Sequence, residues 1–431
     1  MNPRNKNIFH IFFNPISFFF ILFLFTGASW NVISYLESKG ILSITDENDF
    51  YSVMGRSRFY YAGPDNGRFF SGVFQSQLEK ASSDHFPLFA IFAYKKITRY
   101  IDNLFLSILP EDSAPFVPIG GGVLLSPQTK YLFSTPDIFS QSEFSSLSRQ
   151  ADFYNRIQNE HPSIHLFIVP VLDKSDWISF SGPVKSNSRL FRGDKYVKEF
   201  RSYLLPHIKC FWPGESYPPE KAIQLYFKTD HHLNMIGAYQ AYIQLIENIL
   251  PGANNSKSIV QSTSNWFIVP NVEFRGSYSR LAGKFDKIFD NLMDSDFFIP
   301  DYDIYINNIH SDLGFIKTRR FNYLNGKYPK NLFHNHYGSY YGADYGIIEF
   351  INPEESSLGN IVVIGDSNDN ALAPLLASRF SHSYFIDLRL YEDAAGCPFH
   401  LNNFIKHNRI DVVLFFASQH YIFGFTPWEY N

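Results

Sequence analysis

The chain has 431 residues and a net charge of −4; 45% of its residues are hydrophobic and 18% are charged. This length is enough for two domains or for one large domain with insertions, and the hydrophobic content excludes wholesale disorder. The small net charge and the absence of a basic block argue against a nucleic-acid partner. Aromatic residues make up 18% of the chain, which fits either core packing under a coding bias or rings that line a sugar-binding groove.

The N-terminal stretch 8–33 is apolar and contains no ionisable side chain other than His10. A membrane span needs about 20 apolar residues, so the stretch is long enough. Arg4 and Lys6 precede it, whereas acidic residues follow it from Glu37 onward. This asymmetry places the N-terminus in the cytoplasm and the body of the protein outside.

We therefore predict a retained transmembrane anchor over residues 1–38. It would be single-pass in the inner or cytoplasmic membrane, with the remainder on the periplasmic or extracellular side. A signal peptide cut near Ala28 is the competing interpretation. In an exported protein, Cys210 and Cys397 would form one disulfide or remain as two buried free thiols.

The body of the chain begins with an irregular lead-in and a helical region over 39–110. Residues 120–134 then predict a strand, a turn and a second strand, and residues 142–159 predict a helix. Short apolar runs typical of strands buried on both faces follow at 165–171, 361–367, 383–388 and 411–417. Helical segments between several of these runs imply right-handed crossovers and a mostly parallel sheet.

Residues 111–431 are thus predicted to form one α/β domain. Within it, segment 251–350 is rich in Asn, Asp, Tyr and Phe and has weak periodicity. We predict that this segment is a long insertion over the sheet and not a separate domain.

The sequence Gly365-Asp366-Ser367 ends the strand predicted at 361–367. Functional groups gather at the carboxyl ends of strands in an open α/β sheet. Gly365 permits a tight turn and a close approach of backbone to ligand. Free N–H groups at the strand-to-helix junction favour a developing oxyanion beside Ser367. Asp and Ser are also ordinary turn and capping residues, so this motif is weak on its own.

A serine nucleophile needs a base, and the base needs an orienting acceptor. Asp230, His231 and His232 lie between a strand predicted at 223–228 and a helix predicted at 234–250. Asp230 and His232 are two positions apart and can point the same way in an extended turn, so we favour His232 over His231 as the base.

Two other interpretations of this triplet stand beside the catalytic one. An Asp-x-His turn can simply cap its helix. A metal site would need three or four ligands, and no second ligand cluster at suitable spacing appears in the sequence. We predict no metal and no cofactor.

The two motifs together resemble the SGNH-hydrolase-like domain of the alginate O-acetyltransferase family (AlgJ/AlgX-like) and the related DHHW-motif proteins. The positions that match the family pattern are Thr229, Asp230, His232, Gly237, Ala238, Gly365, Asp366 and Ser367. Pro170 and Lys174 match an earlier strand of the family. Leu233 stands where the family usually has Trp, and Asn368 where an aromatic residue often follows the serine.

This resemblance implies a three-layer α/β/α SGNH-hydrolase-like domain that acts as a serine-dependent O-acetyltransferase on an exported polysaccharide. Ser367 would be the nucleophile, His232 its base and Asp230 the residue that orients the base. Besides the Ser367 N–H, the candidate oxyanion or substrate contacts are Asn368, Arg389 and Gly365.

The implied partners are a polysaccharide acceptor and a membrane-bound acyltransferase that delivers the acyl donor. A carbohydrate esterase with the same triad and a non-catalytic glycan-binding member of the family are the alternatives. The polar character of segment 251–350 speaks against a lipase-like role.

Overall fold

The computed structural model describes residues 117–120, 123–126, 129–134, 145–177, 193–249, 266–282, 288–295, 303–311, 322–323, 325–328, 335–342, 344–352 and 358–424. The anchor predicted over 1–38 and the region 39–110 lie outside these residues. In the described part of the chain, no helix is both long and apolar enough to cross a membrane.

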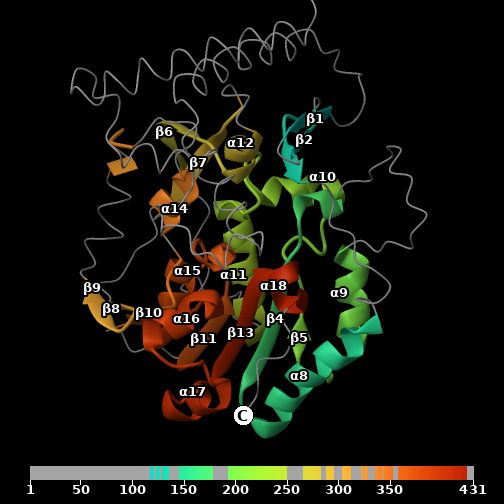
Figure 1. Ribbon diagram of the computed structural model, residues 1–431, viewed down its shortest axis with the longest axis vertical. Helices are drawn as coiled ribbons and strands as arrows, with labels where there is room; N and C mark the ends of the chain where they lie inside the picture. Colours follow the sequence, from blue (N-terminus) through green and yellow to red (C-terminus); the bar gives the residue numbers. More distant parts are fainter. Residues whose placement is uncertain are drawn as a thin grey trace, which may run out of the picture. The chain divides into compact units, whose positions relative to one another are not determined.

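An eight-stranded sheet forms the centre of the described structure, in the order β5-β4-β13-β11-β12-β10-β8-β9 (Figure 1). In that order the strands are Lys209–Cys210, His165–Val171, Val412–Ser418, Asn360–Gly365, His382–Ile386, Ile347–Ile351, Asp303–Ile306 and Ile309–Ser311. The strands from β5 to β12 are parallel, and β10, β8 and β9 extend the sheet in antiparallel fashion. The four strands predicted from apolar runs and the largely parallel sheet are confirmed.

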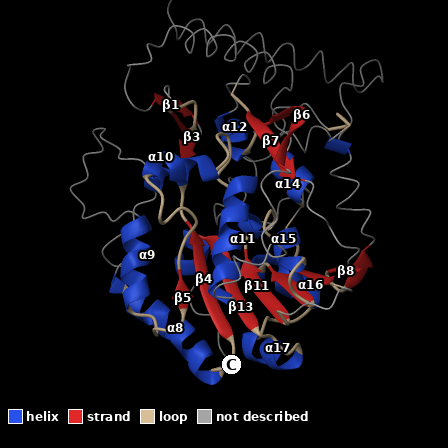
Figure 2. Cartoon of the chain, turned by 180° about the vertical axis from the view of Figure 1, so that it is seen from behind, coloured by secondary structure: helices blue, strands red, loops and turns tan. Residues whose placement is uncertain are grey.

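Helices cover both faces of this sheet, which gives a three-layer arrangement (Figures 1 and 2). On one face lie α8 (Leu147–Glu160), α9 (Gly193–Ser202), α16 (Leu388–Ala395), α17 (Leu401–His407) and α18 (Gln419–Gly424). On the other face lie α11 (Met235–Ile249) and α15 (Ala373–Ala377).

Helix α8 shows why these segments are helical. Its buried residues Leu147, Ala151, Tyr154 and Ile157 recur at spacings of three and four, so they share one face. The Tyr154 ring meets Phe415 of β13 edge-to-face at 4.9 Å, a favourable aromatic geometry. The helix predicted at 142–159 is thereby confirmed.

Smaller elements lie beyond the carboxyl ends of the parallel strands (Figure 1). They are β1 (Val117–Gly120), β2 (Val123–Leu125), β3 (Leu132–Ser134), β6 (Trp266–Phe274), α12 (Ser277–Ala282), β7 (Asp290–Ser295) and α14 (His336–Tyr341). Strands β2 and β3 pair antiparallel as predicted for 120–134. The segment 251–350 supplies β6, α12, β7 and α14, and it also adds β8, β9 and β10 to the central sheet.

The strand predicted at 223–228 is wrong. The proline pair before it starts a short helix, α10 (Pro219–Ala222), which continues as the 3-10 turn η2 (Ile223–Leu225); proline favours the first helical positions. The backbone then closes a loop over 226–233, with Phe227 N–H donating to the His232 carbonyl at 3.2 Å. The pattern of apolar residues was therefore that of a buried turn.

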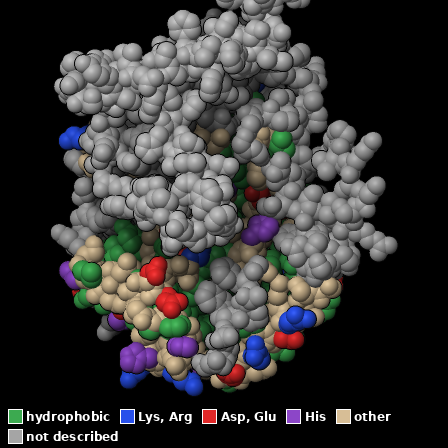
Figure 3. Space-filling model, viewed as in Figure 1, with side chains coloured by type: hydrophobic (Ala, Val, Ile, Leu, Met, Phe, Trp, Pro, Cys, Tyr) green, Lys and Arg blue, Asp and Glu red, His purple; other side chains and the backbone are tan. Residues whose placement is uncertain are grey.

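Neither the charge distribution on the surface nor the cysteines indicate a particular function. Figure 3 shows one face of the molecule, and on the part of it that described residues form, acidic, basic and histidine side chains are interspersed. Cys210 is buried, Cys397 is exposed, and both are free thiols. The disulfide alternative is thus not formed in this structure, and of the two thiols only Cys210 is buried.

Candidate active site

Asp230 lies at the tip of the closed loop 226–233 and is fully buried. Its Oδ2 accepts from the Ser277 N–H at 2.6 Å, and its Oδ1 accepts from the His232 N–H at 3.2 Å. Gly276 lies so close that a Cβ there would stand 2.2 Å from the Asp230 side chain. Only glycine fits at position 276, because the carboxylate occupies the space of a side chain.

His232 connects this carboxylate with Ser367. Its Nδ1 lies 2.6 Å from Asp230 Oδ1, and its Nε2 lies 2.7 Å from Ser367 Oγ. The ionised carboxylate can only accept, so the neutral imidazole carries its proton on Nδ1 and Nε2 accepts from the serine hydroxyl. The structure therefore brings Asp230, His232 and Ser367 into one hydrogen-bonded chain across 135 residues of sequence.

Ser367 opens the 3-10 turn η5 (Ser367–Asp369), directly after β11 and its capping residue Asp366. One Asp366 oxygen accepts from the Asn368 N–H at 3.0 Å, and the other accepts from the Ser418 N–H at 3.0 Å at the end of β13. These bonds fix the turn to two neighbouring strands. The Ser367 N–H is the first of the turn and has no acceptor within it, so it can face a ligand.

Gly365 leaves the space that this turn needs, because it has no side chain. A Cβ at this position would stand 2.1 Å from Asp369 Oδ2 and 2.6 Å from the Phe416 carbonyl. The glycine thus lets the Asp369 carboxyl and the neighbouring strand approach the backbone. Burial and the nearby carboxylates hold the pKa of Asp369 well above its usual range.

The electrostatics favour a neutral base beside an ionised carboxylate. Burial and the charge of His231 lower the pKa of His232, against the opposing effect of Asp230. Burial alone would raise the pKa of Asp230, but the two histidines hold it well below its usual range. At neutral pH His232 can therefore take a proton, and Asp230 can stabilise the cation that forms.

Three residues that support this loop were not among the predicted site residues. Asp290 of β7 accepts from the N–H groups of Lys228 and Thr229 at 2.6 and 2.9 Å and from the Thr229 hydroxyl at 2.7 Å. The Lys174 ammonium, fully buried, donates to the Phe227 and Lys228 carbonyls at 2.7 and 3.0 Å. Burial lowers the pKa of Lys174 to about 8. The sequence had singled out Lys174 only as a family match.

The third unpredicted residue is Tyr337 of α14. Its ring stacks on the His232 imidazole with centroids 3.7 Å apart and planes 6° apart. On the opposite face, the His231 ring lies 3.8 Å from that of His232. His231 is 40% exposed, and its Nδ1 lies 2.8 Å from Ser277 Oγ. No signal in the weakly periodic segment 251–350 pointed to Tyr337.

Asn368 and Arg389, the other predicted oxyanion or substrate contacts, both donate hydrogen bonds to carboxylates. The Asn368 amide donates to Asp366 Oδ1 at 2.9 Å and keeps a second N–H. Arg389, at the start of α16, donates to Asp387 at 2.9 Å and to Asp344 at 3.3 Å. The oxyanion roles of Asn368 and Arg389 stay predictions.

Asp230, His231 and His232 also form a group whose ligand atoms lie within 4.8 Å of one another, the type of cluster that can hold a metal ion. Both nitrogens of His232 already face protein partners, Asp230 and Ser367. A metal on His232 would have to displace one of these contacts. The arrangement thus suits proton transfer better than ligation.

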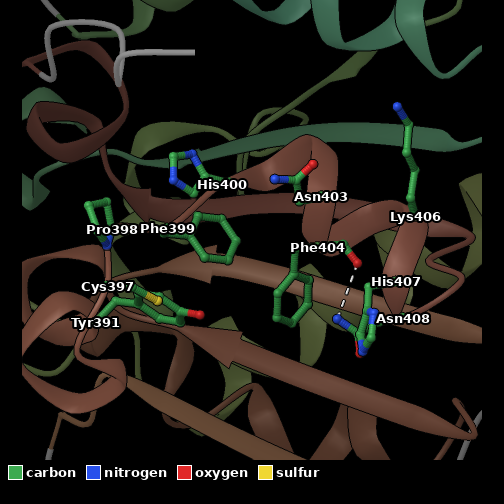
Figure 4. Close-up of a pocket in the computed structure, with 10 residues that line it drawn as sticks. All are labelled: Tyr391, Cys397, Pro398, Phe399, His400, Asn403, Phe404, Lys406, His407 and Asn408. Atoms are coloured by element: carbon green, nitrogen blue, oxygen red, sulfur yellow. Dashed lines mark hydrogen bonds between the residues drawn. The ribbon is translucent and has the colours of Figure 1, made fainter. Parts of the chain in front are cut away.

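A cavity of about 670 Å³ lies elsewhere, between α16 and α17 (Figure 4). Phe399 and Phe404 line it, and Lys406 extends away from their rings. None of the residues of the Asp230, His232 and Ser367 chain lines this cavity. Helix α17 leads into the amino end of β13, whereas Ser367 follows the carboxyl end of β11, so the cavity is not part of the site.

Solved structures with the same fold support the expected resemblance. Bacillus cereus PatB1, in a structure with a sulfonyl adduct, shares 20% identity at a TM-score of 0.52, over 70% of this chain and 95% of its own. A DHHW family protein from Eubacterium siraeum shares 18% identity at a TM-score of 0.51, over 72% of this chain and 94% of its own. The resemblance to DHHW proteins is confirmed at the level of the fold.

A more distant similarity is found to the O-acetyltransferase domain of Pseudomonas putida AlgJ, with 14% identity and a TM-score of 0.36, over 71% of this chain and 96% of that domain. This similarity is too low to bear on function. No protein-family model matches the sequence, and no curated protein matches it.

Proposed function

We propose that this protein is a member of the AlgJ/AlgX-like and DHHW group and a serine-dependent O-acetyltransferase that acts on an exported polysaccharide. The observation that carries the proposal is the hydrogen-bonded chain Asp230–His232–Ser367. A nucleophile, a base and an orienting carboxylate in this order are the constellation of acyl-transfer catalysis. The family resemblance of the two motifs, which the shared fold supports, is the reason to propose acetyl as the acyl group and a polysaccharide as its acceptor.

In the first half-reaction, His232 Nε2 takes the Ser367 proton as Oγ attacks the carbonyl carbon of the acyl donor. The bond between that carbon and the donor's leaving group then breaks, and His232 returns the proton to the leaving group. The Ser367 N–H is the first candidate to stabilise the oxyanion, and each such donor contributes about 10²–10³-fold. General-base assistance contributes about 10²–10⁴-fold more.

In the second half-reaction, a polysaccharide hydroxyl loses its proton to His232 and attacks the Ser367 ester. The new ester forms on the polymer, and the proton returns from His232 to Ser367 Oγ. Water in place of the hydroxyl would make the same site an esterase. The proposed membrane anchor over residues 1–38 would hold the site on the outer side of the membrane, beside a membrane protein that delivers acyl groups.

The test is intact-mass spectrometry of the purified full-length chain after incubation with p-nitrophenyl acetate, followed by peptide mapping. A sulfonyl fluoride serves as a second probe, suggested by the adduct in the PatB1 structure. We expect a single adduct on Ser367 that is lost in Ser367→Ala and His232→Ala. Ser378→Ala is the matched control, because the Ser378 hydroxyl donates to a helix carbonyl, that of Leu375, at 2.7 Å and takes no part in the proposed chemistry.

Incubation of the acetylated chain with candidate polysaccharides then separates the two reactions. Ester gained on the polymer supports the transferase, and ester lost from an acetylated polymer supports the esterase. A wild-type chain with no adduct from either probe would contradict the proposal.

A further inference from the structure

Tyr337 touches both halves of the proposed catalytic pair. Its ring stacks on the base, His232, and its hydroxyl donates to the main-chain carbonyl of Ser367 at 2.8 Å. The side chain is buried, with 3% of its surface exposed. A residue from a distant segment of the chain thus joins the base to the nucleophile.

The stack constrains the imidazole in the directions that hydrogen bonds leave free. Bonds to Asp230 and Ser367 lie along the edge of the His232 ring and hold it within its plane. Tyr337 on one face and His231 on the other prevent the ring from tilting out of that plane. Catalytic geometry needs this kind of support from surrounding residues, because small displacements reduce the rate strongly.

The hydroxyl constrains the nucleophile in a similar way. The peptide group after Ser367 is held at both ends: its carbonyl accepts from Tyr337, and its N–H, from Asn368, donates to Asp366 Oδ1 at 3.0 Å. With this peptide fixed, the backbone position of Ser367 is held, and the Oγ contact with His232 Nε2 at 2.7 Å orients its side chain. Burial and nearby carboxylates keep the pKa of Tyr337 well above its usual range, so the hydroxyl remains a donor.

Ordinary core packing is the simpler explanation of a buried tyrosine. Tyr337 does contact other rings, Phe227 at 6.3 Å and Tyr341 at 5.0 Å. Packing alone, however, explains neither a ring parallel to the base within 6° nor a hydroxyl directed at the nucleophile's own carbonyl. Both features serve the alignment of His232 with Ser367.

We propose that Tyr337 is a positioning residue that holds the His232 imidazole with its ring and the Ser367 backbone with its hydroxyl. The inference rests on the proposed function, since it assigns Tyr337 a role in the same acyl transfer. The proposal assigns two separate contributions to Tyr337: its ring acts on the base, and its hydroxyl acts on the nucleophile.

Two variants test the two contributions in the full-length chain. Tyr337→Phe keeps the ring and removes the hydroxyl, whereas Tyr337→Leu removes both. Tyr340→Phe is the matched control from the same helix, because its hydroxyl bonds to Asp294 and its ring packs against Tyr341. The measurements are the rate of Ser367 acetylation by p-nitrophenyl acetate as a function of pH, and the pKa of His232 from NMR of labelled histidine.

Tyr337→Phe should react about five- to tenfold more slowly, the effect of one hydrogen bond, with an unchanged His232 pKa. Tyr337→Leu should lose about 10²-fold, and its His232 pKa should rise, because burial is the main cause of the low value. The other charged groups that face His232 are Asp230, His231 and Asp366, and both variants leave them in place. Tyr340→Phe should behave as wild type.

Wild-type rates and an unchanged His232 pKa in both folded variants would overturn the inference while leaving the proposed function intact. A wild-type chain that is not acetylated on Ser367 would instead contradict the proposed function itself. If Tyr337→Leu does not fold, Tyr337→Phe decides: a wild-type rate overturns the role of the hydroxyl, and a slower rate at an unchanged His232 pKa supports it.

Discussion

Replacing Asp230 with Asn is expected to lower the rate of Ser367 acylation by about 10⁴-fold. The carboxylate accepts from a backbone N–H on each oxygen, Ser277 N at 2.6 Å and His232 N at 3.2 Å. An amide offers one acceptor oxygen and one NH₂ group. Whichever way the substituted amide lies, one of these N–H groups will face another donor.

The shorter contact decides the orientation of the amide. The oxygen should stay with the Ser277 N–H, which turns the NH₂ group toward His232 Nδ1. That nitrogen must then accept, so the imidazole proton moves to Nε2 and the base can no longer take the Ser367 proton. The same change in Ser-His-Asp proteases costs about 10⁴-fold for this reason, or ~5 kcal/mol in activation free energy. The unpaired donors should also reduce folding stability by about 1–3 kcal/mol.

The assay is the time course of the acetyl adduct by intact mass, with Asp411→Asn as the control. The Asp411 carboxylate also accepts from a backbone N–H, that of Asn360 at 2.8 Å, but at the amino end of the sheet. It therefore matches the chemistry of the substitution and lies away from Ser367. An Asp230→Asn rate within tenfold of wild type, in a folded protein, would refute the tautomer argument.

Two further predictions concern pKa values. His231→Gln should raise the pKa of His232, because burial remains but the charge that lowers it further is gone; an NMR titration that shows no change or a fall would contradict this. Burial raises the pKa of the Asp176 carboxyl from 3.8 to about 7. Between these two pH values the folded state binds more protons than the unfolded state, so the free energy of unfolding falls as the pH rises from 3.8 to about 7. Asp176→Asn should flatten this dependence in thermal denaturation measured across that pH range, and an unchanged slope would count against it.

Local pattern was enough to locate the parallel strands and the turn that carries Ser367. A run such as 361–365 is apolar on both faces because helices cover both sides of the sheet, and the polar residues that follow necessarily lie at its carboxyl end. The same logic failed at 223–228, where a short apolar run is equally compatible with a buried turn. Periodicity over so short a run does not separate these two cases.

The contacts that hold the candidate site residues in place could not be predicted from local sequence pattern. Asp290 and Tyr337 meet the loop 226–233 only through tertiary folding, and neither lies in a motif. Glycine at position 276 is likewise explained by the Asp230 side chain and not by its own neighbours in sequence. Spacing along the chain carries no information about such approaches, since residues far apart can be in contact in any order.

The segment 251–350, which we predicted as an insertion over the sheet, also makes contacts with the candidate site. Its residues supply an N–H to Asp230 through Ser277, hold the preceding backbone through Asp290 and stack on His232 through Tyr337. His232 and Asp230 belong to the loop 226–233, but contacts from this segment hold both side chains. Removing β6, α12 and β7 would remove the Ser277 N–H that Asp230 accepts and the Asp290 carboxylate that holds the backbone before it, so this segment contributes contacts to the candidate site.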